Sequence, residues 1–474
     1  MVSTTMHFMP GCEILQSFDL VNWEHVTYVY ETLDHTDAQQ LKSGQNIYGQ
    51  GMWAASLRYH EGRFYICFVA NDTRKTYLYT SEKIDGPWKK QLIEGFYHDG
   101  SLLFDEDGRS YIVYGNDEIW ITELNEDLTA PKKDGLHRLL VSDHKNPELG
   151  YEGSHIQKIN GYYYIFLVHS LRDRWMRTEA CFYSDSLEGE FTGGDVLCDD
   201  CGYCGQGVAQ GGIVDTPDGK WYAMLFQDSG AVGRIPILLP VTWKDHFPIF
   251  GQNGHVPEEI EVHSTRPGYI YQPLVGSDDF CNGLLPRWQF NHDPDPRYYH
   301  LDALQGTYTI TTREVCTELT QAVNTLTQRM SYPSCAAEVT VDASALKEGD
   351  VAGLCALQGC YAAVGITKHH GKYEVLMLDK KEDGILDMTE GTVVESHQMD
   401  FRLEADFCNM KDEARCYYRV NKGDWLPIGT VHRLYFKLDH FTGCRFGLFC
   451  YAAEETGGSA CFRDFKYYDV DEIS

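Results

Sequence analysis

The sequence predicts an all-β protein: a five-bladed β-propeller whose first blade is N-terminally incomplete, followed by a β-sandwich. Three observations support this prediction. A hairpin pattern repeats four times in the first half, its spacing suits blades of about four strands, and short alternating strands fill the second half. The expected boundaries are 1–260 for the propeller, 261–276 for a linker and 277–474 for the sandwich. A chain of 474 residues is long enough to bury two cores.

Each of the four hairpins has a short strand, a turn that ends in glycine, and a second strand rich in Tyr and β-branched residues. The segments are WAASLRYHEGRFYICFVA, DGSLLFDEDGRSYIVYGN, EGSHIQKINGYYYIFLVH and QGGIVDTPDGKWYAMLFQ. Turns of this kind need a positive φ, which glycine adopts without strain. The turn glycines Gly62, Gly108, Gly161 and Gly219 are 46, 53 and 58 residues apart, a spacing that indicates propeller blades.

The first blade is expected to lack its first strand. Ser81 lies 19 positions after its hairpin glycine, Gly62, so the glycine that matches Ser17 is expected before Met1. The run MVSTT is then the second strand of a hairpin whose first strand lies outside the chain. The alternative is a first blade with three strands by nature.

The hairpin repeat stops near residue 260, and residues 261–276 are predicted to form an extended linker. Alternating segments follow at near-regular spacing, including SCAAEVTVDAS, GKYEVLMLD, DFRLEADFC and HRLYFKLDHF. Many short alternating strands predict a sandwich of two sheets.

The charge balance excludes some partners. With 70 acidic against 40 basic residues, the net charge of −30 repels phosphate backbones and anionic lipid headgroups. Nucleic acid and membrane surfaces are therefore not expected as partners, whereas neutral ligands remain open. No apolar run approaches 18 residues and no signal-peptide pattern stands at the start, so the expected location is the cytoplasm.

The 16 cysteines are scattered through strand-like runs, where a reduced cysteine acts as a small hydrophobe. A reducing compartment is expected. Cys198, Cys201 and Cys204 have ligand-like spacing, but a zinc ion or cluster needs a fourth ligand that the sequence does not identify. A loop of free thiols is the favoured interpretation.

One residue stands nine positions before each turn glycine, where the inner strand begins: Trp53, Asp99, Glu152 and Gln210. Inner strands converge on the propeller axis, so these side chains are expected to face one cavity. Two carboxylates beside an aromatic wall suit glycoside hydrolysis, in which a carboxylic acid protonates the leaving oxygen. The alternative is that each carboxylate binds backbone N–H groups at a strand end, but the recurring register favours a functional site.

Several of these segments carry a resemblance to a known family. GMWAASLRYHEGRFY, HDGSLLFDEDGR, EGSHIQKINGYYY, GRIPILLPVTW and HFMPGCEILQSFDLVNWE resemble glycoside hydrolase family 43, in the branch with a C-terminal sandwich. The resemblance implies an inverting enzyme with Glu152 as general acid and Asp99 as the residue that orients it. An ionised Asp99 is expected to raise the pKa of Glu152 and keep it protonated.

The same resemblance implies substrate-binding residues. Arg234 is expected to contact the sugar, Trp53 to form a wall of the pocket, and His7 and Phe8 to line it. Phe290, in WQFNHDPDP of the second domain, is expected to reach over the funnel and restrict it to terminal sugars. The alternative for QFNH is a structural cap on the propeller.

Two positions depart from the family pattern. The family's general base is an aspartate on the first strand of blade one, and residues 1–10 contain no acidic residue, so a rate loss of at least ~10²–10⁴ is expected. Gln210 stands where many members have a histidine at a central calcium, which weakens the case for calcium. No cofactor is expected to be required, and no metal ligand is assigned.

The expected function is an exo-acting inverting hydrolase that releases arabinofuranose from arabinoxylan fragments, with turnover reduced by the missing base. Its expected partners are xylan-derived oligosaccharides, and the oligomeric state is left open. The preference for arabinofuranose rests on STTMHFMPG and AQGGIVDTPDGKW. A β-xylosidase is the alternative, and a non-catalytic sugar-binding propeller is the alternative from another class.

Overall fold

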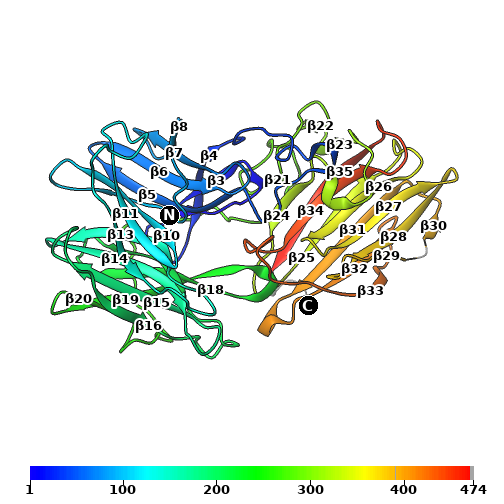
Figure 1. Cartoon of the computed structure of the whole chain (residues 1–474). Helices are drawn as coiled ribbons and strands as arrows, with labels where there is room; N and C mark the ends of the chain where they lie inside the picture. The colour runs from blue at the N-terminus through cyan, green and yellow to red at the C-terminus, as the bar shows by residue number, and fades with distance from the viewer. Residues whose placement is uncertain (390, 470–474) are drawn as a thin grey trace.

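The computed structural model describes residues 1–389 and 391–469, and the strand counts below refer to these residues. Five small sheets form a propeller and two large sheets form a sandwich beside it (Figure 1). Strands of consecutive blades contact one another from the first blade to the fifth. The predicted propeller and sandwich are both confirmed.

Blades two to five are four-stranded antiparallel sheets in which each strand pairs with the next along the chain. The four turn glycines have φ values of 80, 82, 86 and 79°, as the hairpin prediction requires. The strands are, blade by blade, β5 (Met52–His60), β6 (Arg63–Ala70), β7 (Lys75–Ser81) and β8 (Lys89–Ile93); β9 (Ser101–Phe104), β10 (Ser110–Asn116), β11 (Glu118–Leu124) and β12 (His137–Ser142); β13 (Glu152–Ile159), β14 (Tyr162–Ser170), β15 (Arg177–Ser184) and β16 (Thr192–Leu197); β17 (Ala209–Asp215), β18 (Trp221–Asp228), β19 (Arg234–Lys244) and β20 (Phe247–Phe250).

The sheet of the first blade has three strands within the described residues: β1 (Val2–Ser3), β3 (Gly11–Gln16) and β4 (Glu24–Tyr30). β3 pairs with both of the others and ends just before Ser17, whose counterpart Ser81 ends β7. These strands therefore match the second, third and fourth strands of the other blades.

The segment after β20 runs from the fifth blade across the first. The Thr265 amide donates to the Phe18 carbonyl at 2.7 Å, and the Gln272 amide donates to a Glu24 carboxylate oxygen at 3.0 Å. Asp278 then bridges to Phe465 in the sandwich. The linker thus connects the two ends of the propeller ring before it enters the second domain.

The sandwich consists of two antiparallel sheets that share a buried apolar core. One contains β2 (Phe8–Met9), β21 (Gln289–Asn291), β24 (Leu326–Arg329), β34 (Arg445–Ala452), β26 (Asp350–Leu357), β27 (Ala362–His369), β28 (Lys372–Lys380), β29 (Leu386–Met388) and β30 (Thr392–Val394). The other contains β22 (Tyr299–Asp302), β23 (Thr307–Thr311), β35 (Ser459–Asp469), β25 (Ser334–Asp342), β31 (Gln398–Asp406), β32 (Glu413–Val420) and β33 (Leu426–Arg433). Short 3₁₀ turns are η1 (Lys42–Gly44), η2 (Gly230–Val232), η3 (Leu319–Gln321) and η4 (Cys408–Met410).

One N-terminal strand joins the two domains. β2 precedes β3 of the first blade in sequence, yet it pairs with β21 of the sandwich through Phe8 with Asn291 and Met9 with Phe290. Figure 1 shows this N-terminal part of the chain reaching β21. The propeller and the sandwich therefore share a sheet.

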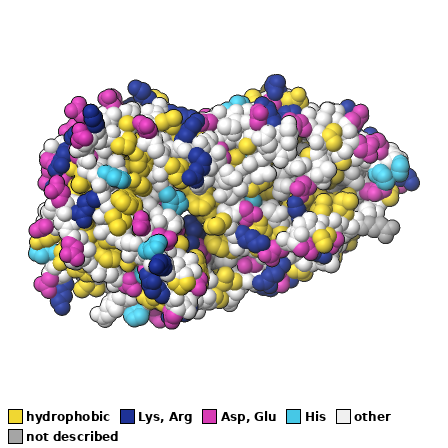
Figure 2. All heavy atoms as spheres, viewed as in Figure 1, with side chains coloured by type: hydrophobic (Ala, Val, Ile, Leu, Met, Phe, Trp, Pro, Cys, Tyr) yellow, Lys and Arg dark blue, Asp and Glu magenta, His cyan; other side chains and the backbone are white. Residues whose placement is uncertain are grey.

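Acidic and basic side chains are interspersed over the face of both domains drawn in Figure 2. Within the described part of the chain, no helix has the length and apolar character needed to cross a bilayer.

Candidate functional site

The pairing of the inner strands is irregular at the end where the predicted site residues lie. The register shifts between Met52 and Ala55 in β5, and the same shift recurs at the start of β13 and of β17. β-Bulges of this kind re-aim side chains at the rims of sheets. Asp99 and Gln210 have φ values of 48 and 66°, in the left-handed region that Asp tolerates better than branched residues do.

The structure brings the two predicted carboxylates together with an imidazole. His98 Nε2 lies 3.6 Å from Glu152 Oε2 and 3.7 Å from Asp99 Oδ2. The Asn116 side-chain amide donates to Glu152 Oε2 at 2.8 Å, and the Gly153 amide donates to Asp99 Oδ2 at 3.1 Å. Both carboxylates are therefore oriented by donors other than the imidazole.

The proton balance of this trio differs from the expectation. Burial, reinforced by the Glu152 charge and opposed by His98, raises the pKa of Asp99 to about 6. Burial also acts to raise the pKa of Glu152, but the close polar contact and charge of His98, with two nearby arginines, outweigh it and lower that pKa. The expected raised pKa of Glu152 is thus not found. Sequence reasoning missed His98, although it directly precedes Asp99 in YHDGS.

Two arginines near Glu152 bind the same buried aspartate, Asp228. Arg177 Nε donates to Asp228 Oδ2 at 3.1 Å, and Arg234 Nε donates to Asp228 Oδ1 at 3.2 Å. Arg177 Nη1 also donates to Gln210 Oε1 at 3.3 Å. Burial, with the charge of Arg177, lowers the pKa of Arg234 to about 10, so this guanidinium stays charged at neutral pH. Arg177 and Asp228 carried no motif signal that the sequence reasoning used.

An aromatic wall completes the site, and one of its members comes from the sandwich. The Trp53 ring lies 5.4 Å from the Phe441 ring and 6.1 Å from the His98 ring, measured between centroids. Phe441 also lies 4.3 Å from the Arg234 guanidinium carbon. Trp53 Nε1 is buried and has no hydrogen-bond partner among the described residues.

The prediction for Phe290 is wrong. Its side chain is 7 % exposed, belongs to the apolar core of the sandwich and lies 5.1 Å from the Tyr299 ring. The backbone of Phe290 pairs with Met9, and this pairing fixes the side chain toward the core instead of the funnel. Phe441 is the sandwich side chain that reaches the site.

The prediction that His7 and Phe8 line an open pocket is also wrong, because both are fully buried. The His7 ring packs 4.9 Å from His292 and 5.2 Å from His440. Phe8 lies under the Arg445 guanidinium, 3.7 Å from its carbon. β2 pairing with the sandwich places both residues in the contact between the domains.

Two family models match the chain: "Glycosyl hydrolases family 43" over residues 1–248 and "Beta xylosidase C-terminal Concanavalin A-like domain" over residues 277–468. The chain belongs to glycosyl hydrolase family 43. It is 26 % identical to a "Beta-xylosidase" of Formosa agariphila, with 99 % of this chain and 85 % of that protein covered. It is 24 % identical to a "Non-reducing end alpha-L-arabinofuranosidase" of Bacteroides ovatus, with 65 % and 59 % covered.

A solved structure described as "Bifunctional GH43-CE" from Bacteroides eggerthii superposes with a TM-score of 0.91 at 41 % identity. All of this chain is covered, and it spans 61 % of that protein's chain. The shared part is therefore the propeller and sandwich together.

The residues of the propeller channel do not fit the calcium that the family resemblance implies. Arg58 Nε donates to the Leu102 carbonyl at 2.8 Å, Nη1 to the Leu57 carbonyl at 2.9 Å and Nη2 to the Ile156 carbonyl at 2.9 Å. These carbonyls come from three blades and already bind a cation. Gln210 Oε1, the other candidate ligand, accepts from Arg177.

Among the described residues, one group of three metal-ligand side chains converges within 4.8 Å: His98, Asp99 and Glu152. These are the imidazole and the two carboxylates of the candidate site. All sixteen cysteines are unpaired thiols, and Cys198, Cys201 and Cys204 are exposed on one loop.

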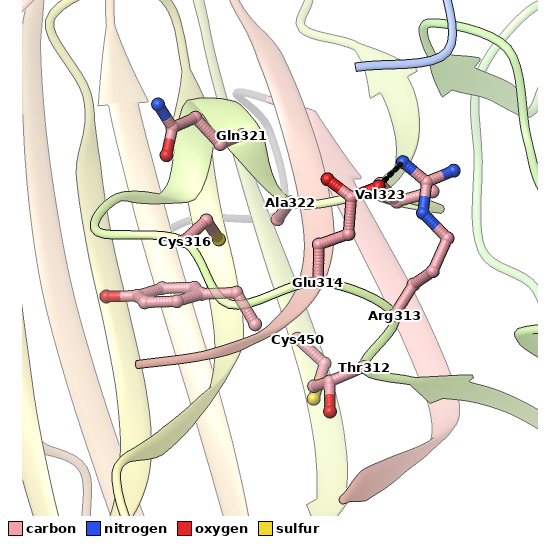
Figure 3. Close-up of a pocket in the computed structure, with 9 residues that line it drawn as sticks. Thr312, Arg313, Glu314, Cys316, Gln321, Ala322, Val323 and Cys450 are labelled. Atoms are coloured by element: carbon pink, nitrogen blue, oxygen red, sulfur yellow. Dashed lines mark ion pairs between the residues drawn. The ribbon is translucent and has the colours of Figure 1, made fainter. Parts of the chain in front are cut away.

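A separate crevice in the sandwich is too small to bind sugar (Figure 3). Its volume is about 10 Å³, room for roughly one water. Arg313 and Glu314 form an ion pair at its edge, 3.0 Å apart. The crevice is therefore not a candidate sugar site.

Proposed function

We propose that this family 43 chain is an exo-acting, inverting hydrolase of xylan-derived oligosaccharides, with Glu152 as general acid and Asp99 as its orienting partner. The observation that carries the proposal is the closure of the site by Phe441. Glu152 and Arg234 lie on the propeller side and the Phe441 ring of the sandwich packs on Arg234, so we expect this side of the site to be closed. A closed end suits a terminal sugar, whereas an internal unit of a chain would need an open groove.

We propose arabinofuranose as the released sugar. The name of the Bacteroides ovatus relative supports it. Terminal xylose is the second candidate, because the Formosa relative is named for it and the model of the second domain is described by it. Initial rates on aryl α-L-arabinofuranoside and aryl β-D-xyloside, measured in parallel, test the choice. Activity on the xyloside alone would contradict it.

We further propose that residues 1–474 turn over slowly, because the acidic residues of the first sheet, where the family places its base, bind other groups. Glu13, Asp19 and Glu24, the acidic residues of the first sheet and its loop, are all hydrogen-bonded to neighbouring groups. Asp228 is neutralised by two arginines. Glu179 is fully buried, and burial raises its pKa, so its carboxyl favours the protonated form and lies away from water.

Azide tests this part of the proposal, because a small nucleophile replaces the water that a base would activate. We expect azide to raise the rate on an aryl glycoside and to yield a glycosyl azide of inverted configuration. Fast hydrolysis without azide would show that a base is supplied. Sugar binding with no turnover under either condition would favour the non-catalytic sugar-binding propeller.

A reducing location, the cytoplasm, is proposed as well. The support is that all sixteen cysteines are free and many are buried in strands as small hydrophobes. The net charge of −30 supports neutral oligosaccharides over nucleic acid or anionic membranes as partners.

A further inference from the structure

We propose that His98 stores the proton that Glu152 delivers to the leaving oxygen. The inference rests on the proposed function, because it needs Glu152 to act as general acid. Its basis is the position of the imidazole, with Nε2 between Glu152 Oε2 and Asp99 Oδ2 at 3.6 and 3.7 Å. Both distances are slightly longer than a direct hydrogen bond. We infer that a small rotation of the His98 ring brings Nε2 within hydrogen-bond distance of either carboxylate.

The imidazole is not needed to hold the carboxylates in place. Asn116 fixes Glu152, and the backbone amide of Gly153 fixes Asp99. Ser154 Oγ donates to the Asp99 carbonyl at 2.7 Å and secures the backbone of Asp99 as well. A role in proton transfer therefore explains His98 better than a purely structural one.

The charges that face His98 favour a proton on it in the empty site. Burial acts to lower the pKa of His98, but the close polar contact with Glu152 and the charges of both carboxylates outweigh burial and the opposing charge of Arg74, and raise it. On the far side of Glu152, Arg177 and Arg234 help to lower the pKa of that carboxyl. The three groups titrate as a coupled set in which the imidazole is protonated before Glu152.

Sugar binding reverses this order. A sugar that displaces water from the funnel makes the separated imidazolium and carboxylate charges more costly. The Nε2–H bond of His98 then breaks and an O–H bond forms on the Glu152 carboxyl, which leaves both groups neutral.

The chemical step uses that proton. The Glu152 O–H bond breaks as the proton passes to the glycosidic oxygen, and the C1–O bond breaks with its electron pair moving to the same oxygen. Water, or azide where it is added, forms the new bond at C1 from the opposite face, and a proton of the attacking water passes to solvent. The neutral imidazole then takes a proton from water, which it reaches because its side chain is 21 % exposed. Transfer from His98 to Glu152 restores the acid for the next cycle.

The test compares leaving groups in the full chain, with the same azide concentration throughout. A dinitrophenyl glycoside needs no acid, whereas a methylumbelliferyl glycoside does. We expect His98→Gln to lose about 10²-fold in kcat/KM on the second substrate and less than about threefold on the first, as removal of acid assistance predicts. His60→Gln is the matched control, because His60 is 35 % exposed and lies near the turn of the β5–β6 hairpin, at the other end of β5 from the site.

Equal losses on the two substrates, or no loss, would overturn the inference. A wild-type chain that cleaves neither substrate, with or without azide, would instead overturn the proposed function. If His98→Gln does not fold, NMR titration of the His98 ring in wild type and Glu152→Gln decides the question. The pKa of His98 is expected to fall in Glu152→Gln, and an unchanged pKa would refute the proton store.

Discussion

The Phe441 ring of the sandwich lies 4.3 Å from the guanidinium carbon of Arg234 in the propeller. Backbone contacts hold this arrangement: the Cys444 amide donates to the Ala231 carbonyl at 2.8 Å, next to η2 and Arg234. At Gly233, where φ is 96°, a Cβ would lie 2.7 Å from the Gly443 nitrogen, so the two loops approach too closely for a side chain. The second domain is therefore a wall of the site.

Phe441→Ala is expected to weaken the binding of the terminal sugar. It removes the aromatic ring that packs on Trp53 and Arg234. If the ring contributes to sugar binding what one aromatic contact usually does, roughly 0.5–2 kcal/mol, KM should rise by about 2- to 30-fold. The loss should be accompanied by new cleavage within longer xylo-oligosaccharides, seen by chromatography of products. Phe64→Ala, in β6 beside the hairpin turn, is the control and should leave KM unchanged. An unaltered KM in Phe441→Ala would contradict the assignment of Phe441 to the sugar site.

Glu152→Gln is expected to lower kcat/KM on a methylumbelliferyl glycoside by about 10²–10⁴, the usual contribution of a general acid. Binding of the product sugar, followed by calorimetry, should change little because the amide keeps the shape of the carboxyl. Glu148→Gln, an exposed acidic residue on the loop before β13, is the matched control. Activity that survives in Glu152→Gln would assign the acid to another residue.

The buried histidines between the domains predict a loss of stability in acid. Burial, with the charge of His440, lowers the pKa of His292 to about 3, and burial lowers that of His7 well below 6.5. The unfolded chain takes up these protons near pH 6.5 and the folded chain does not. The free energy of unfolding should therefore be highest above pH 6.5 and fall below it by about 1.4 kcal/mol per pH unit for each histidine.

Urea unfolding between pH 8 and pH 4 measures this slope. His292→Gln removes one of the titrating groups, so its stability should fall less steeply with acid than that of wild type. His300→Gln, on an exposed residue of β22, should keep the wild-type slope. Identical slopes in wild type and His292→Gln would show that the cluster is not the source.

The contacts of Arg58 lead us to expect a propeller that is stable without calcium. Because its guanidinium already binds carbonyls from three blades, EDTA should leave the Tm of wild type unchanged. Arg58→Met leaves those buried carbonyls without a donor and should cost about 3 kcal/mol or more. Added calcium should then raise the Tm of Arg58→Met but not that of Arg63→Met, an exposed control in β6. A Tm of wild type that drops with EDTA would contradict the assignment.

Local patterns were enough to predict the propeller and the register of its inner strands. Turn glycines and alternating strands report backbone conformations that neighbouring residues impose, so the hairpins were predictable. Equal spacing from each turn glycine also placed Asp99 and Glu152 at the same end of adjacent blades, and their side chains do meet across His98. Arg234 was placed by the family resemblance and lies beside them.

The errors fall where the two domains touch. Phe290, His7 and Phe8 were assigned to the pocket, but the pairing of β2 with β21 buries all three. β2 has two residues and therefore no periodicity to detect, and its partner β21 lies about 280 residues away in the chain. Arg177, Asp228 and Phe441 were missed because nothing in the residues around them marks a site.

By itself the sequence determined the all-β class, the repeated blade and the pair of carboxylates, because each depends on residues close in the chain or on a constant offset from a turn. The tertiary structure alone decided which sandwich ring covers the site and which side chain lies beside Glu152. Those outcomes depend on distances between segments far apart in sequence. His98 lowers the pKa of Glu152 because its positive charge, a few ångströms away in a buried site, outweighs the effect of burial.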